Sequence, residues 1–284
     1  MKIDRNRMLG ILGFIAASIL WSTAGILIKL VNWSHIPIAG IRSLIAAILM
    51  FAYLRKPKFT FSKAQMIGAF AMAATMILFV TANKMTTAAN AILLQFTAPV
   101  FVALLSSFLL KEKVRRSDWL VIVVVLGGLS LFFLGDMTTG NLIGNLLAIL
   151  SGFTLATMII SLRMQKDGSP VESTLLGNLI TFLVAIPFIA TAPIPDIKSI
   201  LGLVLLGIFQ LGLAYIIFAN AIKRVTAVEG VLLNVVEPLC NPIWVFLFVG
   251  ELPKGSALIG GIIVLAAVTA RSVFSVNETS SPNS

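Results

Sequence analysis

Four polar side chains that could do chemistry lie in one apolar stretch, residues 226–251. It reads TAVEGVLLNVVEPLCNPIWVFLFVGE and carries Glu229, Asn234, Glu237 and Asn241. The last three are spaced i, i+3 and i+7, so a helix places them on one face. A carboxylate within the hydrocarbon of a membrane is costly, and an acid there is by default a candidate functional group. The pattern predicts binding of a cation or uptake of a proton.

Both acids also have a structural alternative. Glu237 could pair with a cationic substrate or carry a proton, because burial of an unpaired carboxylate favours its neutral form. It could instead cap the backbone that Pro238 leaves without helical partners. This structural role is the first choice, cation pairing the second and proton coupling the third. Glu229 could couple transport to an ion, or simply pair with Lys223 or Arg224.

The composition requires a membrane for most of the chain. Of its 284 residues, 58% are hydrophobic and 11% charged, and the mean hydropathy is +1.03. A spanning helix takes about 20 residues, so ten would use about 200 and leave only short loops. The net charge of +10 reflects Lys and Arg of cytoplasmic loops rather than a nucleic-acid partner. The sequence predicts an all-α, multi-pass protein of a prokaryotic plasma membrane.

Clusters of turn residues and charges divide the chain into ten expected spans. Most Lys and Arg residues fall on one side of them, which predicts that both termini are cytoplasmic. Residues 275–284 are expected to form a disordered cytoplasmic tail. The spans are residues 8–31, 36–54, 64–83, 86–110, 117–134, 141–163, 171–192, 199–222, 226–249 and 255–274.

The two halves of the sequence repeat. TTAANAILLQFTAP (86–99) aligns with VTAVEGVLLNVVEP (225–238), and the same offset aligns Pro99 with Pro238 and Glu112 with Glu251. Five spans separate the copies, and an odd number inverts the second one. Inverted repeats are typical of transporters whose binding site lies near the middle of the membrane, at the repeat interface.

Four segments carry a family resemblance. AASILWSTAGILIK (16–29), PIAGIRSLIAAILM (37–50), NKMTTAANAILLQFTAPVFVALLSSFLLKEKV (83–114) and residues 220–253 resemble helices one, two, four and nine of the EamA branch of the drug/metabolite transporter superfamily. The resemblance implies ten helices in two inverted repeats, residues 8–134 and 141–274. It also implies a central cavity lined by helices 1, 3, 4, 6, 8 and 9, and transport of small metabolites or drugs.

The candidate substrate-binding residues are polar or aromatic side chains within the expected spans. Each has a structural alternative: aromatic rings are ordinary in membrane cores, small residues allow close packing, and buried amides such as Gln95 join helices. The candidates are Trp21, Ser22, Phe79, Asn90, Thr97, Gln210, Tyr215, Asn234, Glu237 and Trp244.

Five further residues are expected to be structural: Arg42, Pro99, Glu112, Pro238 and Glu251. Arg42 is expected to extend toward the outer surface or to pair with an outer-side acid such as Asp136. Glu112 and Glu251 follow apolar runs at helix C-termini, where an anion opposes the helix dipole. Each is therefore expected to have a basic or N-terminal partner from another helix.

No phosphate-binding glycine motif and no Cys/His cluster occurs in the sequence, so we expect no cofactor, no metal and no ATP-driven pump. The predicted function is alternating-access transport of small organic metabolites, with amino acids and related compounds first. Two alternatives remain: a proton-coupled exporter of cationic or lipophilic compounds, and a lipid-flipping or structural subunit. A membrane enzyme is not expected. The expected partners are a small-molecule substrate and the lipid bilayer, with a monomer preferred over a dimer.

Overall fold

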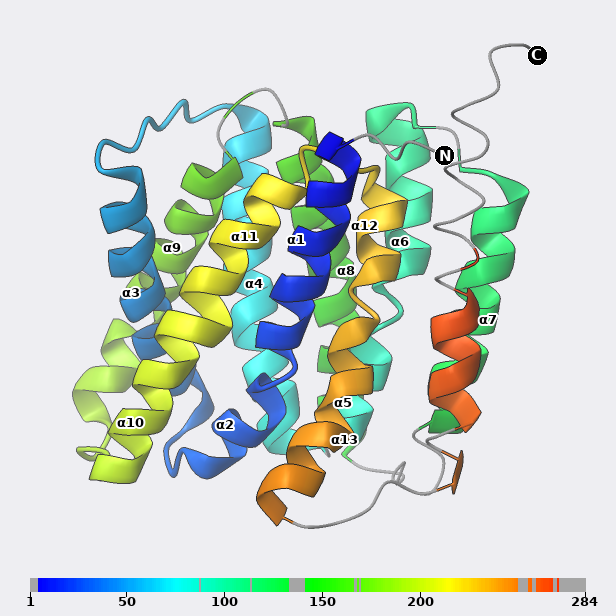
Figure 1. The fold of residues 1–284 in the computed structure, drawn as a ribbon. Helices are drawn as coiled ribbons and strands as arrows, with labels where there is room; N and C mark the ends of the chain where they lie inside the picture. The colour runs from blue at the N-terminus through cyan, green and yellow to red at the C-terminus, as the bar shows by residue number, and fades with distance from the viewer. Residues whose placement is uncertain are drawn as a thin grey trace.

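The computed structural model is a helical bundle (Figure 1). The structure describes residues 5–86, 88–112, 114–132, 141–165, 168, 170–249, 255–256, 259–267 and 270, and no strand occurs among them. Residues 259–267 are helical. The other elements are α1 (Arg5–Trp21), α2 (Ala24–Leu30), α3 (His35–Leu54), α4 (Lys63–Met85), α5 (Ala88–Gln95), α6 (Ala98–Leu105), η1 (Ser106–Leu110), α7 (Arg116–Phe132), α8 (Leu142–Met164), α9 (Pro170–Thr191), α10 (Ile197–Leu205), η2 (Leu206–Leu213), α11 (Ala214–Ala221), α12 (Ala227–Leu233) and α13 (Val236–Val249).

Six helical segments are long and apolar enough to cross a membrane. They confirm the expected all-α, multi-pass class, whereas the count of ten spans stays a prediction. The segments are Arg5–Ile28, His35–Leu54, Lys63–Met85, Leu142–Met164, Pro170–Thr191 and Ile197–Ala221.

Two helices of corresponding sequence are broken in the middle. The first breaks at residues 96–97, between α5 and α6, and the second at residues 234–235, between α12 and α13. Pro99 and Pro238 follow the two breaks, and a proline has no N–H for the preceding helical turn. Figure 1 shows α5 and α6 running toward the end where α1 begins, while α12 and α13 run away from it. This opposite direction is what an inverted repeat requires.

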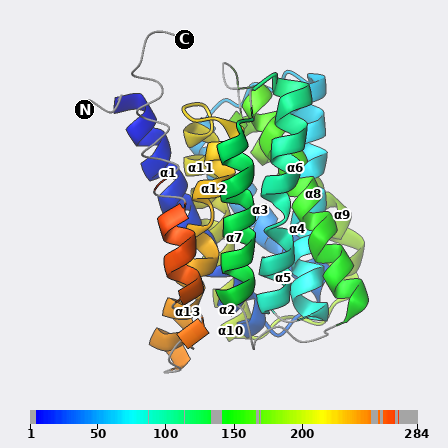
Figure 2. The same cartoon turned by 90° about the vertical axis from the view of Figure 1, so that its right-hand side faces the viewer.

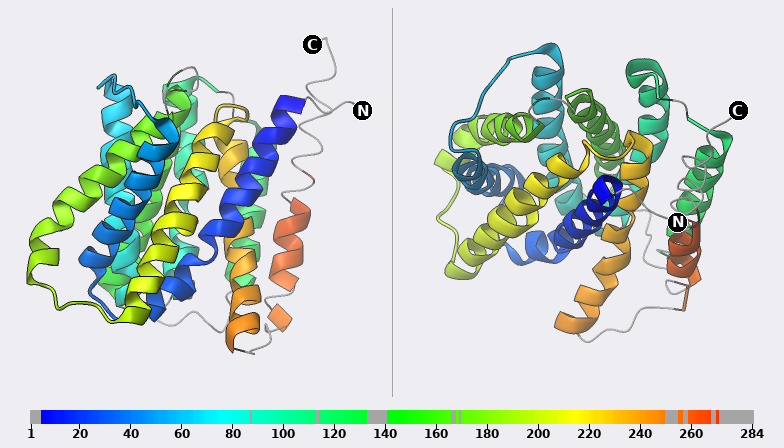
Figure 3. Two further views of the ribbon diagram at one scale, coloured as in Figure 1. Left: turned by 60° about the vertical axis from the view of Figure 1, so that its left-hand side comes forward. Right: turned by 45° about the horizontal axis from the view of Figure 1, so that its top comes forward.

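Small residues bring the helices close together. A Cβ atom added to Gly177 in α9 would lie 2.8 Å from the Met72 Cβ atom of α4 and 2.9 Å from the Ala69 carbonyl oxygen. Only glycine therefore allows α9 this approach to α4. Besides this pair, α4 packs against α8 and α3 against α9. Figures 2 and 3 show the resulting bundle from the side and toward its top end.

A charged cluster closes the end of the bundle at which α1 begins. The Glu112 Oε1 atom accepts a hydrogen bond from Arg163 Nε at 2.9 Å, and Oε2 accepts one from the Ala227 backbone N–H at 3.1 Å. Arg163 Nη1 also donates to the carbonyl oxygens of Ile222 and Lys223, both at 3.1 Å. The expectation for Glu112 is confirmed, since its partners are a basic side chain and the N-terminus of α12. Glu251 lies outside the described residues.

Glu229 belongs to the same end of the bundle. Its Oε1 atom pairs with Arg7 Nη2 at 2.7 Å, which links α12 to α1. The alternative that Glu229 pairs with Lys223 or Arg224 was therefore wrong. The distant Arg7 comes close because α1 packs against α12, a contact that sequence spacing does not reveal.

Candidate functional site

A cavity lies between the two halves of the chain. It holds about 50 Å³ of free volume, which is room for only a few water molecules. Ligand sites for drug-sized molecules are usually several hundred Å³ in volume, so this conformation is too narrow for most organic metabolites. The lining residues are Trp21, Arg42, Thr75, Met76, Phe79, Gln95, Phe96, Ala98, Pro99, Leu155, Gln210, Leu211, Tyr215, Val231, Asn234 and Glu237.

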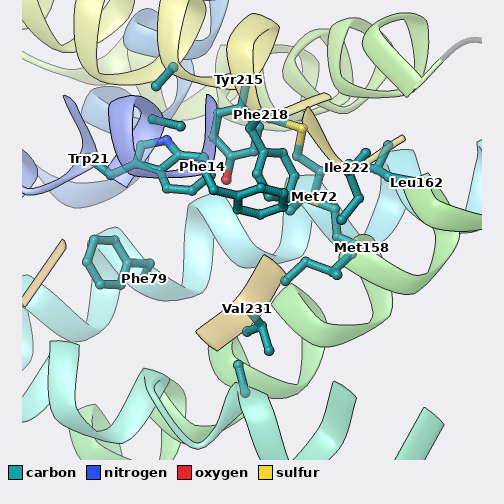
Figure 4. Packing of buried hydrophobic residues seen from close by; sticks show 14 of the residues in the cluster. Phe14, Trp21, Met72, Phe79, Met158, Leu162, Tyr215, Phe218, Ile222 and Val231 are labelled. Carbon is teal, nitrogen blue, oxygen red and sulfur yellow. The ribbon is translucent and has the colours of Figure 1, made fainter. Parts of the chain in front are cut away.

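Aromatic rings form one wall of the cavity. The Trp21 ring of α1 lies 4.9 Å from the Tyr215 ring and 5.1 Å from the Phe218 ring of α11, measured between centroids. Figure 4 shows these three rings together, with Phe79 below Trp21 in this view. Phe218 is not among the lining residues and packs edge-on against Phe14, at 5.2 Å between ring centroids. This wall offers π faces to an apolar or cationic ligand.

Arg42 of α3 also lines the cavity and is 1% exposed. Its Nη1 atom donates to Gln210 Oε1 at 3.2 Å, and Nη2 lies 3.5 Å from the Met76 sulfur. The expected extension toward the outer surface was therefore wrong. The side chain turns inward because Gln210 and the cavity supply a polar environment within the bundle. A charged group in a membrane helix can be accommodated there as well as at the surface.

Glu237 supplies the acid of the cavity, at the start of α13. Its side chain is partly buried, and no described residue forms an ion pair or a side-chain hydrogen bond with it. The neighbouring Asn234 is buried and accepts a hydrogen bond from Ser18 Oγ at 3.2 Å. The break before α13 thus directs one carboxylate and one amide to the same wall.

The candidates from the sequence divide into three groups. Trp21, Phe79, Gln210, Tyr215, Asn234 and Glu237 line the cavity. Ser22, Thr97 and Trp244 are not among its lining residues, and their polar atoms are bonded within the bundle. Trp244 Nε1 donates to Ser22 Oγ at 2.7 Å, and Thr97 Oγ1 donates to the Leu94 carbonyl oxygen at 2.8 Å. The Asn90 side chain lies outside what the structure describes.

Several residues that line the cavity were not among the substrate-binding candidates from the sequence, or were expected to have another role. Gln95 joins helices as expected, because its Nε2 atom donates to Ser151 Oγ of α8 at 2.6 Å, and it also lines the cavity. Thr75 and Met76 carried no recognisable signal, since a threonine and a methionine are ordinary within an apolar helix. Arg42 did carry such a signal, because a charged residue within an apolar run is a functional candidate by default.

The arrangement suits binding rather than catalysis. One guanidinium, one carboxylate, three amides and an aromatic wall face a common space, which is the composition of a recognition site for a small polar molecule. Within the described part of the chain, no three His, Cys, Asp or Glu side chains come together as metal ligands would.

Comparisons with known proteins agree with this architecture. The EamA-like transporter family matches residues 8–134 and 142–272. The uncharacterized transporters YdfC and YwfM of Bacillus subtilis are 30% and 27% identical to the chain. The YdfC alignment covers 88% of this chain and 86% of the relative, and the YwfM alignment 88% and 91%. The pseudopaline exporter CntI of Pseudomonas aeruginosa strain PAO1 is 26% identical, and its alignment covers 93% of this chain and 95% of the relative.

A solved crystal structure has the same fold, with a TM-score of 0.78 at 19% identity, and the match covers 96% of this chain and 99% of that one. The family match extends over both halves, and a relative at 30% identity is aligned over most of its length. The chain therefore belongs to the EamA-like transporter family and is a membrane transporter of that type.

Proposed function

We propose that the protein is a secondary transporter or facilitator of small organic metabolites, with amino acids and related compounds as the leading class. The observation that carries the proposal is the cavity, which the two halves of the chain line together and which contains both a guanidinium and a carboxylate. A molecule with an ammonium and a carboxylate group would complement both charges. The substrate-binding role of the lining residues is part of this proposal.

The narrow cavity supports transport by alternating access. A free volume of about 50 Å³ is far below the several hundred Å³ of typical sites for organic ligands, so we expect helices to separate when a metabolite enters. The two repeats, residues 8–134 and 141–274, are the proposed moving units. In inverted-repeat carriers, one repeat rocks against the other around a fixed central site.

The test is binding followed by transport. We expect some L-amino acids to raise the melting temperature of the detergent-solubilised protein, because a ligand of the native state stabilises it. The same compounds should enter proteoliposomes and exchange with labelled substrate inside, and protein-free liposomes are the control. Binding without any exchange, or movement of fluorescent lipid alone, would contradict the proposal.

A second candidate is a proton-coupled exporter of cationic or lipophilic compounds. Glu237 in the cavity could exchange a proton for a cationic substrate, and the relative CntI is named as an exporter. Substrate addition to proteoliposomes should then change the internal pH. A facilitator would leave the pH unchanged.

The proposed topology puts both termini in the cytoplasm of a prokaryote. The segment between α3 and α4 lies at the end of the bundle where α1 begins, and the start of α10 lies at the opposite end (Figure 1). Lys58 belongs to the first segment and Asp196 directly precedes α10, and both residues are exposed. In a Cys240→Ala background, a cysteine at Lys58 should react only with reagents applied from the cytoplasm. A cysteine at Asp196 should react with an impermeant maleimide added outside whole cells. The reverse pattern contradicts the orientation.

A further inference from the structure

The Arg42 guanidinium has no counter-ion in the described part of the chain. Gln210 and Met76 are its only side-chain partners there, and its Nε atom has no hydrogen-bond acceptor. A guanidinium stays protonated at physiological pH, and an unpaired buried charge is strongly unfavourable. Glu237 lines the same cavity but forms no ion pair with Arg42. The charge is therefore left for a group that the protein does not itself supply.

Trp21 supplies a second unsatisfied donor on the cavity wall. Its side chain is 6% exposed, and its Nε1 atom is buried without a hydrogen-bond partner among the described residues. An indole N–H can only donate, and the same holds for a guanidinium. The missing partner of each group must therefore be an acceptor, and for the positively charged Arg42 a negatively charged acceptor is favoured.

The backbone of η2 holds the Arg42 side chain in place. Gln210 lies within this π-helical segment, and π-helical turns are frequent at functional sites. A Cβ atom added to Gly207 would lie 3.0 Å from the Arg42 carbonyl oxygen, and one added to Gly212 would lie 2.8 Å from Leu49 Cδ2. Two glycines thus bring η2 directly against α3, where Gln210 binds Nη1 and leaves Nε without a partner.

From these contacts we infer that Arg42, with Gln210 as its positioning residue, is an anion subsite for the carboxylate group of the transported molecule, in a cavity that Trp21 also lines. The inference rests on the proposed function and names the substrate chemistry. A guanidinium can bind a carboxylate or a phosphate through two parallel hydrogen bonds. A carboxylate is favoured because Glu237 in the same cavity would repel an anion of higher charge.

The experiment measures anion binding without requiring transport. The melting temperature of the solubilised protein is followed in sodium acetate, in sodium phosphate and in sodium chloride at equal ionic strength. We expect a saturable stabilisation by acetate beyond that in chloride, and none specific to phosphate. Gln210→Glu should weaken apparent acetate binding at least about tenfold, the scale of a lost charged hydrogen bond. The new carboxylate would occupy Arg42 itself.

Gln210→Glu is preferred to Arg42→Gln because it provides the missing counter-ion and should keep or raise stability without acetate. Lys56→Gln is the control, since it removes an exposed positive charge just after α3 and should leave acetate binding unchanged.

Equal acetate binding by parent and Gln210→Glu, or no acetate binding at all, would overturn the subsite. Specific stabilisation by phosphate alone would overturn its assignment to carboxylates. Arg42-dependent acetate binding without transport of any metabolite would count against the proposed function only.

Discussion

Arg163→Ala is expected to lower the free energy of unfolding by about 3 kcal/mol, because it leaves the partly buried Glu112 carboxylate without its ion-pair partner. The side chains of Arg163 and Glu112 are only 13% and 21% exposed. Arg163 also binds the carbonyl oxygens of Ile222 and Lys223, just after α11. One substitution therefore removes contacts between three chain segments that meet at this end of the bundle.

The measurement is the midpoint of thermal or denaturant unfolding of the purified protein. Arg116→Ala removes an exposed arginine at the start of α7, and as a control it should cost less than about 0.5 kcal/mol. The double variant Glu112→Gln with Arg163→Ala should be more stable than Arg163→Ala alone, since it no longer leaves a charged partner uncompensated. Equal stability of Arg163→Ala and Arg116→Ala would show that the cluster does not hold this end of the bundle.

Much of this cluster could be predicted from one residue. A glutamate at a helix C-terminus is unfavourable unless it has a partner, and this reasoning pointed from Glu112 to a basic or N-terminal group. It could not identify Arg163 and Ala227, because three-dimensional packing decides which helix ends meet. The same limit explains the partner of Glu229, where a sequence neighbour was expected and Arg7 is found.

Residues 86–110 and 226–249 were expected to be continuous spans, but both are broken, and the prolines in the sequence could have predicted the breaks. Pro99 and Pro238 have a steric effect that acts within one turn, and both breaks occur just before them. The depth and direction of Arg42 were not predictable in this way. A long side chain in an apolar helix can extend to the surface or turn inward, and the choice depends on Gln210, which is far away in sequence.

The individual side chains of the cavity wall were harder to predict than the helices that carry them. Six of the ten proposed binding residues line the cavity, whereas Ser22 and Trp244 bond to each other instead. Trp21 is the last residue of α1 and lines the cavity, whereas Ser22 lies in the turn that follows and binds Trp244 instead. Composition and spacing therefore identified the helices of the site more reliably than its individual side chains.

Glu237→Gln is expected to fold and to lose affinity for amine-bearing substrates by about 1–3 kcal/mol, the range for a hydrogen bond to a charged group. The sequence favoured a structural role for Glu237. Its carboxylate, however, lines the cavity without a hydrogen bond to any described residue, which favours pairing with the substrate. Glutamine keeps the shape and the acceptor oxygen but lacks the charge, so the variant isolates the electrostatic contribution.

Substrate affinity is measured by thermal shift with L-amino acids and with their N-acetyl derivatives, which lack the positive charge. The amino acids should bind the variant more weakly than the parent, while the derivatives should bind both equally. Glu229→Gln is the matched control on the same broken helix. It removes the ion pair with Arg7, so it should lower stability but leave substrate affinity unchanged. Unchanged affinity in Glu237→Gln would restore the structural role. Intact binding with uptake that no longer responds to a pH gradient would instead assign Glu237 to proton coupling.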